Sequence, residues 1–315
     1  MINIKTIADI LLEKDNILIL AHRTPDGDTI GASYALYDVL SSLGKTARIE
    51  CADKFDERFN FITKGIKFKK FEPSYIIAVD VAAHSLLGTK SEEYPHVDMC
   101  IDHHETRTRF ADIVYTDGKA SAACEIVFEI IKELIGDITY KQALALYTGI
   151  ATDTGCFKFP NVTVRTHQIV AELMTKGINC GEINEKVFCK TKSRALLEAT
   201  LVSNAIFLCD NKVMIQTLTK ELRDELGASD DDVHSIAGAP QTIDGVLLGI
   251  TIRYDGKNCR LSVRTDSPLS ASDFCSQFNG GGHDRAAGCK IDNTLENVLP
   301  IIIKKAEKAI NSMNT

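Results

Sequence analysis

Residues 16–28, NILILAHRTPDGD, decide how the first half of this chain folds. Five of the first six residues are apolar, which is typical of a short strand buried on both faces. A polar stretch with one histidine and two aspartates follows at once. Because open α/β sheets bind ligands at the carboxyl ends of their strands, this segment predicts a strand that leads into a binding site.

Alternation of strands and helices continues outward from this segment. Apolar residues at helical spacing predict a helix over residues 29–43, before Gly44. Further strands are expected at residues 47–51, 75–79 and 97–101, and further helices at residues 121–134 and 140–151. The pattern predicts an α/β domain whose sheet is mostly parallel and covered by helices.

The second half predicts a smaller α/β domain. Strands are expected at residues 212–217, 245–254 and 259–264, and the Asp255-Gly256 turn joins the last two as a hairpin. A final helix is expected from residue 294, with Pro300 as a kink or a restart. We therefore predict domains at residues 1–188 and 209–315, joined by a helical linker at residues 189–208.

The composition is that of a globular protein. Of its 315 residues, 44% are hydrophobic and 25% charged, and no run reaches the ~18 apolar residues of a membrane span. The first residues lack the features of a signal peptide, so we expect a cytoplasmic protein that does not bind membranes. The net charge of −7 disfavours a grip on long duplex nucleic acid. The ten cysteines form no CxxC pair, and we assign them no chemistry.

Acidic residues and histidines follow several of the apolar runs. Asp80 follows YIIAV, Asp102-His103-His104 follows VDMCI, and Asp153 ends an apolar helix. Any one of these residues alone would be an ordinary turn, cap or structural residue. Together they form a set of six candidate ligands: His22, Asp26, Asp28, Asp80, His103 and Asp153.

This set suits a pair of divalent cations. Imidazole and carboxylates without a thiolate suit Mn²⁺, Fe²⁺ or Zn²⁺. Six ligands are too many for one ion, but they suit two ions if one carboxylate bridges them. Two ions about 3.5–4 Å apart can activate water and clamp a phosphoryl group. The residues therefore indicate a two-metal site for phosphate chemistry.

The motifs resemble those of the DHH phosphoesterases. The four N-terminal motifs are His22-x-x-Pro25-Asp26-x-Asp28-x-x-Gly31, Asp80, Asp102-His103-His104 and Thr152-Asp153-Thr154-Gly155. The C-terminal half is similar to the DHH-associated domain and carries Ser262-Val263-Arg264-Thr265 and Gly280-Gly281-Gly282-His283-x-Arg285-Ala286-Ala287-Gly288. Four ordered motifs and a matching second domain make the resemblance specific over nearly the whole chain.

The resemblance implies a role for each site residue. His22, Asp26 and Asp80 would hold one ion, and Asp28, Asp80, His103 and Asp153 the other, with Asp80 as the bridge. The ions would be Mn²⁺, with Mg²⁺, Co²⁺ or Fe²⁺ as substitutes. Asp102 would orient a motif histidine, and His104 would contact the phosphate or assist the leaving group. The expected substrate-binding residues are Arg264, Gly281, Gly282, His283 and Arg285, with the active site in the cleft between the domains.

The length and the domain pair look most like the NrnA-like branch of nano-RNases and 3′-phosphoadenosine-5′-phosphate (pAp) phosphatases. The resemblance implies hydrolysis of short oligoribonucleotides or dinucleotides to mononucleotides, and of pAp to AMP. Alternatives are a cyclic-dinucleotide phosphodiesterase and a nucleotide sensor without turnover. An inorganic pyrophosphatase would need a different second domain, and a RecJ-type exonuclease a longer chain. A homodimer is also expected.

Overall fold

The computed structural model describes residues 2–104 and 108–313. The chain forms two compact units, Met1–Cys189 and Lys190–Thr315, and each is described by itself.

The first unit is built on a five-stranded sheet in the order β2-β1-β3-β4-β5. Every neighbouring pair is parallel, which confirms the predicted parallel sheet. The strands are β1 (Ile17–Ala21), β2 (Ala47–Glu50), β3 (Tyr75–Val79), β4 (Val97–Asp102) and β5 (Ala111–Thr116). Because the strands are parallel, their carboxyl ends meet at one edge of the sheet, where the motif residues follow β1, β3 and β4.

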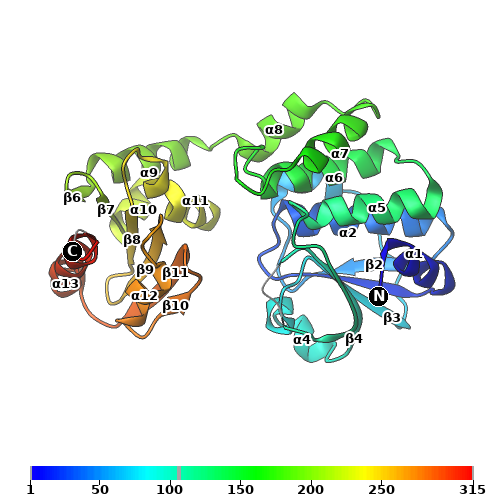
Figure 1. Cartoon of the computed structure of the whole chain (residues 1–315), viewed down its shortest axis with the longest axis horizontal. Helices are drawn as coiled ribbons and strands as arrows, with labels where there is room; N and C mark the ends of the chain where they lie inside the picture. Colours follow the sequence, from blue (N-terminus) through cyan, green and yellow to red (C-terminus); the bar gives the residue numbers. More distant parts are fainter. Residues whose placement is uncertain (1, 105–107, 314–315) are drawn as a thin grey trace. The chain divides into compact units, whose positions relative to one another are not determined.

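Helices cover one face of this sheet (Figure 1). They are α1 (Ile4–Glu13), α2 (Gly27–Ser42), α5 (Ala123–Ile135), α6 (Tyr140–Asp153), α7 (Val164–Met174) and α8 (Cys180–Phe188). Ile17 and Ile19 of β1 are fully buried in the core that includes these helices. Leu18 and Leu20, which point to the other face, pack in a smaller cluster with Leu87.

Short elements make up the rest of the first unit. They are η1 (Glu57–Phe59), α3 (Asn60–Thr63), η2 (His84–Leu87) and α4 (Lys90–Glu93). Leu87 of η2 is fully buried against the second face of the sheet. Burial on both faces explains why β1 and β3 read as continuous apolar runs.

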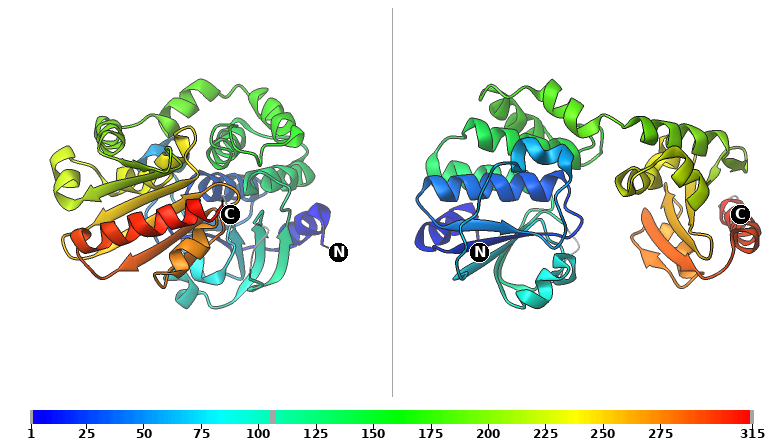
Figure 2. Two further views of the ribbon diagram at one scale, coloured as in Figure 1. Left: turned by 60° about the vertical axis from the view of Figure 1, so that its left-hand side comes forward. Right: turned by 180° about the vertical axis from the view of Figure 1, so that it is seen from behind.

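The second unit is built on a mixed sheet in the order β10-β11-β9-β8-β7-β6 (Figure 2). Its strands are β6 (Ile206–Leu208), β7 (Val213–Thr219), β8 (Leu248–Tyr254), β9 (Cys259–Thr265), β10 (Gly281–Gly282) and β11 (Ala286–Ile291). Only the β7–β8 pair is parallel among the described residues. The predicted β8–β9 hairpin is present, whereas β6, β10 and β11 were not predicted.

Helices lie on both faces of the second sheet. Apolar residues of α12 (Ala271–Ser276) and α13 (Leu295–Asn311) pack on one face in the core of this unit. Pro300 lies inside α13, which runs through it as one helix, so no restart occurs there. The other face is covered over β7 and β8 by α9 (Lys192–Ser203), α10 (Lys220–Leu226), α11 (Asp230–Ser235) and η3 (Ile236–Thr242).

The segment expected to be a linker, residues 189–208, is largely packed into the second unit. It contains α9 and β6, and Leu197 and Leu201 of α9 are buried against Leu218 of β7 and Ile236. Apolar side chains on one face of α9 explain this packing, because a solvated linker would leave them in water. In the part of the chain that the structure describes, no helix is long and apolar enough to cross a bilayer.

Candidate metal centre

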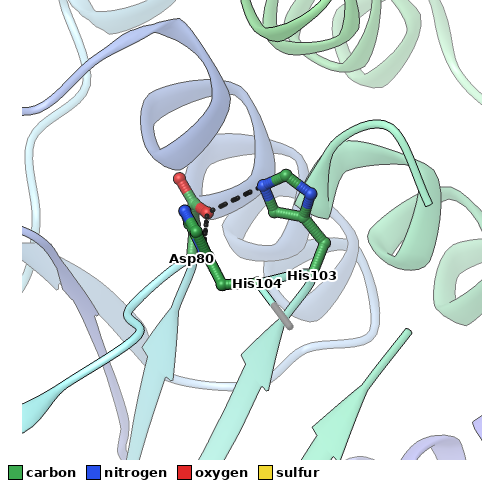
Figure 3. Close-up of side chains that lie close together, drawn as sticks. All are labelled: Asp80, His103 and His104. Carbon is green, nitrogen blue, oxygen red and sulfur yellow. Dashed lines mark ion pairs between the residues drawn. The ribbon is translucent and has the colours of Figure 1, made fainter. Parts of the chain in front are cut away.

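Asp80 lies at the centre of the predicted ligand set. It follows β3 directly and has a left-handed backbone, with φ of +61°, and its N–H donates to the carbonyl of Ile101 on β4 at 2.8 Å. Its side chain is 3% exposed. Oδ2 lies 3.5 Å from Nε2 of His22, and Oδ1 lies 3.6 Å from Nε2 of His103. The two carboxylate oxygens therefore face two different histidines. Figure 3 shows the ion pairs of Asp80 with His103 and His104, which follow β4.

One group of ligand atoms is formed by His22, Asp26 and Asp80. Nε2 of His22 lies 3.6 Å from Oδ1 of Asp26. Nδ1 of His22 lies 2.8 Å from the carbonyl of Arg23, which fixes the proton on Nδ1 and leaves the Nε2 lone pair for a cation. Asp26 also caps α2, because its Oδ1 accepts the N–H groups of residues 28 and 29.

The second group is formed by Asp28, His103 and Asp153. Nε2 of His103 lies 3.3 Å from Oδ2 of Asp153 and 3.8 Å from Oδ2 of Asp28. Nδ1 of His103 lies 3.2 Å from the carbonyl of Ala120, so again Nε2 is left to face the carboxylates. The structure therefore brings all six predicted ligands together in two groups, and Asp80 contacts a histidine of each.

Asp28 is held by a helix far away in sequence. Its carboxylate is fully buried and accepts the N–H of Ala123 at 2.6 Å and that of Cys124 at 2.9 Å, at the start of α5. The N-terminus of a helix stabilises a nearby negative charge. Sequence reasoning missed this contribution, because backbone N–H groups carry no residue signature.

Close packing around Asp28 also depends on a glycine that the sequence did not single out. A Cβ on Gly149 of α6 would lie 2.2 Å from Sγ of Cys124 and 3.0 Å from Cα of Asp28. Only glycine therefore lets α6 approach α2 and α5 closely enough to keep Asp28 and Asp153 in one cluster.

The electrostatics of the cluster favour cations. Burial raises the pKa of Asp28, and the charges of Asp80 and Asp26 raise it further. Burial and the neighbouring Asp28 raise the pKa of Asp153 to about 8. For His22, burial lowers the pKa, but hydrogen bonds to Asp26 and Asp80 outweigh it and raise the pKa to about 11. The carboxylates thus need positive charge.

The chemistry of the donors fits divalent cations. Oδ1 of Asp80 is buried and has no hydrogen-bond partner among the described residues. A buried carboxylate oxygen of this kind needs a proton or a cation. The two groups together offer imidazole nitrogen and carboxylate oxygen and no thiolate, the donors that suit Mn²⁺, Fe²⁺ and Zn²⁺.

Asp102 and His104 form a pair beside the two groups. Oδ1 of the fully buried Asp102 accepts hydrogen bonds from Nδ1 of His104 at 2.7 Å and from the N–H of His103 at 2.9 Å. The hydrogen bond to Asp102 raises the pKa of His104 to about 9. The side chain of His104 is 46% exposed, so its Nε2 is available to a substrate. The motif histidine that Asp102 orients through its side chain is therefore His104.

The predicted substrate-binding residues gather on three neighbouring strands of the second unit. Arg264 lies on β9 and pairs with Ala286 of β11, and Gly281 and Gly282 form β10. His283 begins the tight turn between β10 and β11, in which the N–H of His283 donates to the carbonyl of Ala286 at 2.8 Å. Arg285 is exposed in this turn. The glycine-rich segment is thus an exposed hairpin, and its role in binding stays a prediction.

Two family matches agree with this geometry. The chain matches the DHH family, N-terminal domain, over residues 16–150, which include five of the six clustered side chains. It matches the DHHA1 domain over residues 210–312. The chain carries a DHH domain and a DHHA1 domain. These are the two domains of the predicted pair.

Two relatives that are similar over most of the chain share one name. A Thermus thermophilus protein named bifunctional oligoribonuclease and PAP phosphatase NrnA is 29% identical over 93% of this chain and 91% of its own length. A Bacillus subtilis protein of the same name is 24% identical over 88% of this chain and 90% of its own length.

Solved structures support the fold. An exopolyphosphatase-related protein from Bacteroides fragilis is 26% identical and matches with a TM-score of 0.87 over 98% of this chain and 96% of its own chain. RecJ from Thermus thermophilus, solved with Mn²⁺, matches with a TM-score of 0.58 at 12% identity over 97% of this chain and 54% of its own. The second match shows the shared fold alone.

Proposed function

We propose that this chain is a metal-dependent phosphoesterase that hydrolyses short oligoribonucleotides and dinucleotides to mononucleotides, and pAp to AMP. The observation that carries the proposal is the pair of neighbouring ligand groups, with Asp80 lying 3.5 Å from His22 of one group and 3.6 Å from His103 of the other. The names of the NrnA relatives support the choice of substrate. No observation favours the cyclic-dinucleotide or sensor alternatives.

Two divalent cations, Mn²⁺ in our proposal, would supply Lewis acidity to the phosphate and lower the pKa of water. His22, Asp26 and Asp80 would hold one of them, and Asp28, Asp80, His103 and Asp153 the other. The Nδ1 hydrogen bonds of His22 and His103 orient both imidazoles before any ion binds, which lowers the cost of assembling the site.

His104 is the proton donor in this proposal. With a pKa of about 9 it is protonated at neutral pH, and Asp102 accepts from its Nδ1. Its Nε2 therefore carries the proton that can be passed to the leaving alkoxide oxygen of the nucleoside, which becomes a hydroxyl. Asp102 is fully buried and acts through His104, so it is a positioning residue. Arg264, Arg285 and His283 would hold substrate phosphates, and Gly281 and Gly282 would let the backbone approach them.

The test is an activity panel on purified protein with Mn²⁺, Mg²⁺ or Co²⁺. The substrates are pApA, RNA trimers to pentamers, pAp, cyclic di-AMP and pyrophosphate, with Asp80→Ala and His103→Ala run alongside. We expect mononucleotides from the short oligonucleotides and AMP from pAp, highest with Mn²⁺. Each variant should lose on the order of 10³-fold or more in kcat, because removing a ligand disrupts the two-ion site.

Other outcomes of this panel would favour an inorganic pyrophosphatase or a nucleotide sensor. Pyrophosphate as the only substrate would assign the chain to the pyrophosphatases, although the DHHA1 match disfavours them. Tight nucleotide binding without turnover under any of these metals would leave a sensor. The homodimer and the absence of binding to membranes and long duplexes stay predictions.

A further inference from the structure

One face of the second sheet carries a row of basic residues next to the predicted substrate-binding strands. In β9, Arg260, Ser262 and Arg264 alternate with the buried Cys259, Leu261 and Val263, so the three polar residues share the face opposite the core. Across the strands, Arg253 of β8 and Lys290 of β11 pair with Arg260, and Gly288 of β11 pairs with Ser262. We call Arg253, Arg260, Ser262, Arg264, Gly288 and Lys290 the basic sheet face.

Three arginines on this face form no ion pair within the described residues. Arg253, Arg260 and Arg264 form no ion pair with any residue that the structure describes. Nε of Arg253 is buried and has no hydrogen-bond partner within that same part of the chain. Lys290 differs, because it pairs with Asp292 at 2.6 Å. Unpaired guanidinium groups of this kind fit an external anion.

The direct pairing of Arg253 with Arg260 costs stability. Like charges directly opposite one another in neighbouring strands repel, and burial and Arg260 both lower the pKa of Arg253. Where a sequence breaks a local rule without a structural gain, a functional site is the expected reason. The pair therefore indicates that this face binds a ligand that neutralises it.

A surface cavity lies at the same position. It measures about 400 Å³ and is lined by Arg253 and Arg260 together with Lys220 and Arg223 of α10. Two of its three carboxylates already have partners. Asp230 pairs with Arg223 at 2.9 Å, and Asp255 accepts the N–H groups of the turn residues 257 and 258. The arginine pair thus faces a space large enough for a phosphate group.

The floor between Arg260 and Arg264 is made of small residues. Ser262 is half-buried, and the only atom near a Cβ on Gly288 would be a backbone oxygen at 3.1 Å. Gly288 also pairs with Gly281 of the predicted substrate site, whose own Cβ position is open. Four residues of a strand span about 13 Å, more than the separation of neighbouring phosphates in a single strand. A nucleic-acid backbone can therefore lie close to the sheet along this row.

We propose that the basic sheet face binds the backbone phosphates of a short single-stranded oligonucleotide, beyond the phosphate held near Arg264 and Gly281. The inference rests on the proposed function and names the part of that substrate that this face recognises. It predicts that Arg253 and Arg260 contribute to the binding of long substrates and not to the binding of the shortest ones.

The experiment compares a pentaribonucleotide with the dinucleotide pApA and with pAp. Arg260→Gln and Arg253→Gln should each lower kcat/KM for the pentamer about fivefold, as expected for loss of one exposed charged contact, and change the shorter substrates less than twofold. The salt dependence of pentamer binding should weaken by about 0.7 in log–log slope per arginine removed. Lys304→Gln removes one exposed charge from α13, on the opposite face, and is the matched control.

Two controls separate this inference from a folding defect in the variants and from failure of the proposed function. Relief of the like-charge pair should leave the melting temperature of both arginine variants unchanged or raised. Anisotropy of a labelled pentamer in EDTA measures binding without turnover, because none of the described residues of the second unit belongs to a group of candidate metal ligands. The inference would be overturned if the arginine variants lost kcat/KM equally on all substrates. It would also be overturned if they lost neither kcat/KM nor binding affinity for the pentamer. If the wild type cleaves none of the three substrates but binds the pentamer through Arg260, the proposed function fails and the binding face stands.

Discussion

Removing divalent metal from this protein should make its first unit lose stability as the pH rises. The metal centre places Asp28, Asp80 and Asp153 around His103. Without a cation, burial and mutual repulsion raise the pKa of Asp153 from its usual 3.8 to about 8, and that of Asp28 in the same direction. Folding then needs these carboxyls to keep protons that the unfolded chain gives up.

The direction of this pH dependence follows from the number of protons bound in the folded and unfolded states. Between pH 3.8 and about 8 the folded state holds more protons on Asp153 than the unfolded state does, so the free energy of unfolding falls as pH rises. His22, whose pKa is raised to about 11, acts in the same direction above pH 6.5. Asp26 has a lowered pKa, and its opposite effect is confined to pH below 3.8.

The magnitude can be worked out for a modest pH interval. One extra proton in the folded state changes the free energy of unfolding by about 1.4 kcal/mol per pH unit, so two pH units from about 5.5 to 7.5 cost roughly 2–3 kcal/mol. For a unit of this size the melting temperature should fall by about 5–10 °C. Added Mn²⁺ should reverse the loss at pH 7.5 and have little effect at pH 5.5, where protons compete for the ligands.

Differential scanning calorimetry with EDTA or with Mn²⁺ at both pH values would test this. Asp153→Asn is the matched variant, because it removes one titrating carboxyl and should flatten the pH dependence of the metal-free protein. A melting temperature of the first unit that is constant, or that rises with pH in EDTA, would refute the reasoning. Stabilisation by Mn²⁺ that is equal at both pH values would also do so.

Three further predictions concern single residues. Asp102→Asn should lower the pKa of His104 toward 6.5 and so shift the alkaline limb of the kcat–pH profile to lower pH. At pH 8 the variant should have a kcat about 10- to 100-fold lower than the wild type. An alkaline limb that does not shift would exclude His104 as the proton donor. Gly149→Ala should destabilise the first unit by about 1–3 kcal/mol in urea unfolding, whereas Gly181→Ala on the exposed start of α8 should cost nothing. Leu201→Ala should destabilise the second unit by about 2–5 kcal/mol and leave stabilisation by Mn²⁺ intact, whereas loss of the metal effect would mean that α9 supports the first unit.

The first unit was largely predictable because its strands are buried on both faces. Runs such as ILILA and YIIAV cannot be mistaken for amphipathic surface strands, and the residue after each run falls at the same edge of a parallel sheet. This is why Asp80 and Asp102 could be placed from sequence. The edge strand β5 has half-buried side chains along most of its length and gave no comparable signal.

The second unit was less predictable because its local signals are weaker. β10 consists of two glycines, and β11 begins with two alanines and a glycine, so neither shows the β-branched pattern of a strand. Their pairing with β9 is a tertiary effect. Arg260 and Arg253 likewise read as surface charges in the sequence, and only the strand register places them opposite one another.

Non-local contacts account for the part of the metal centre that no motif contains. Asp28 is fully buried. Its carboxylate is stabilised by two backbone N–H groups more than ninety residues away in the sequence, and Gly149 on α6 leaves room for it. Asp80 adopts a left-handed backbone that no rule predicts for aspartate at a strand end, and this turn, held by the carbonyl of Ile101, aims its two oxygens at two histidines. The left-handed backbone of Asp80 and the repulsion among the carboxylates both cost stability. Such costs persist only where the packing and hydrogen bonds around a site fix its geometry. In this acidic protein, four aspartates are gathered where cations would bind, and three arginines that form no ion pair within the described residues lie on one face of the second sheet.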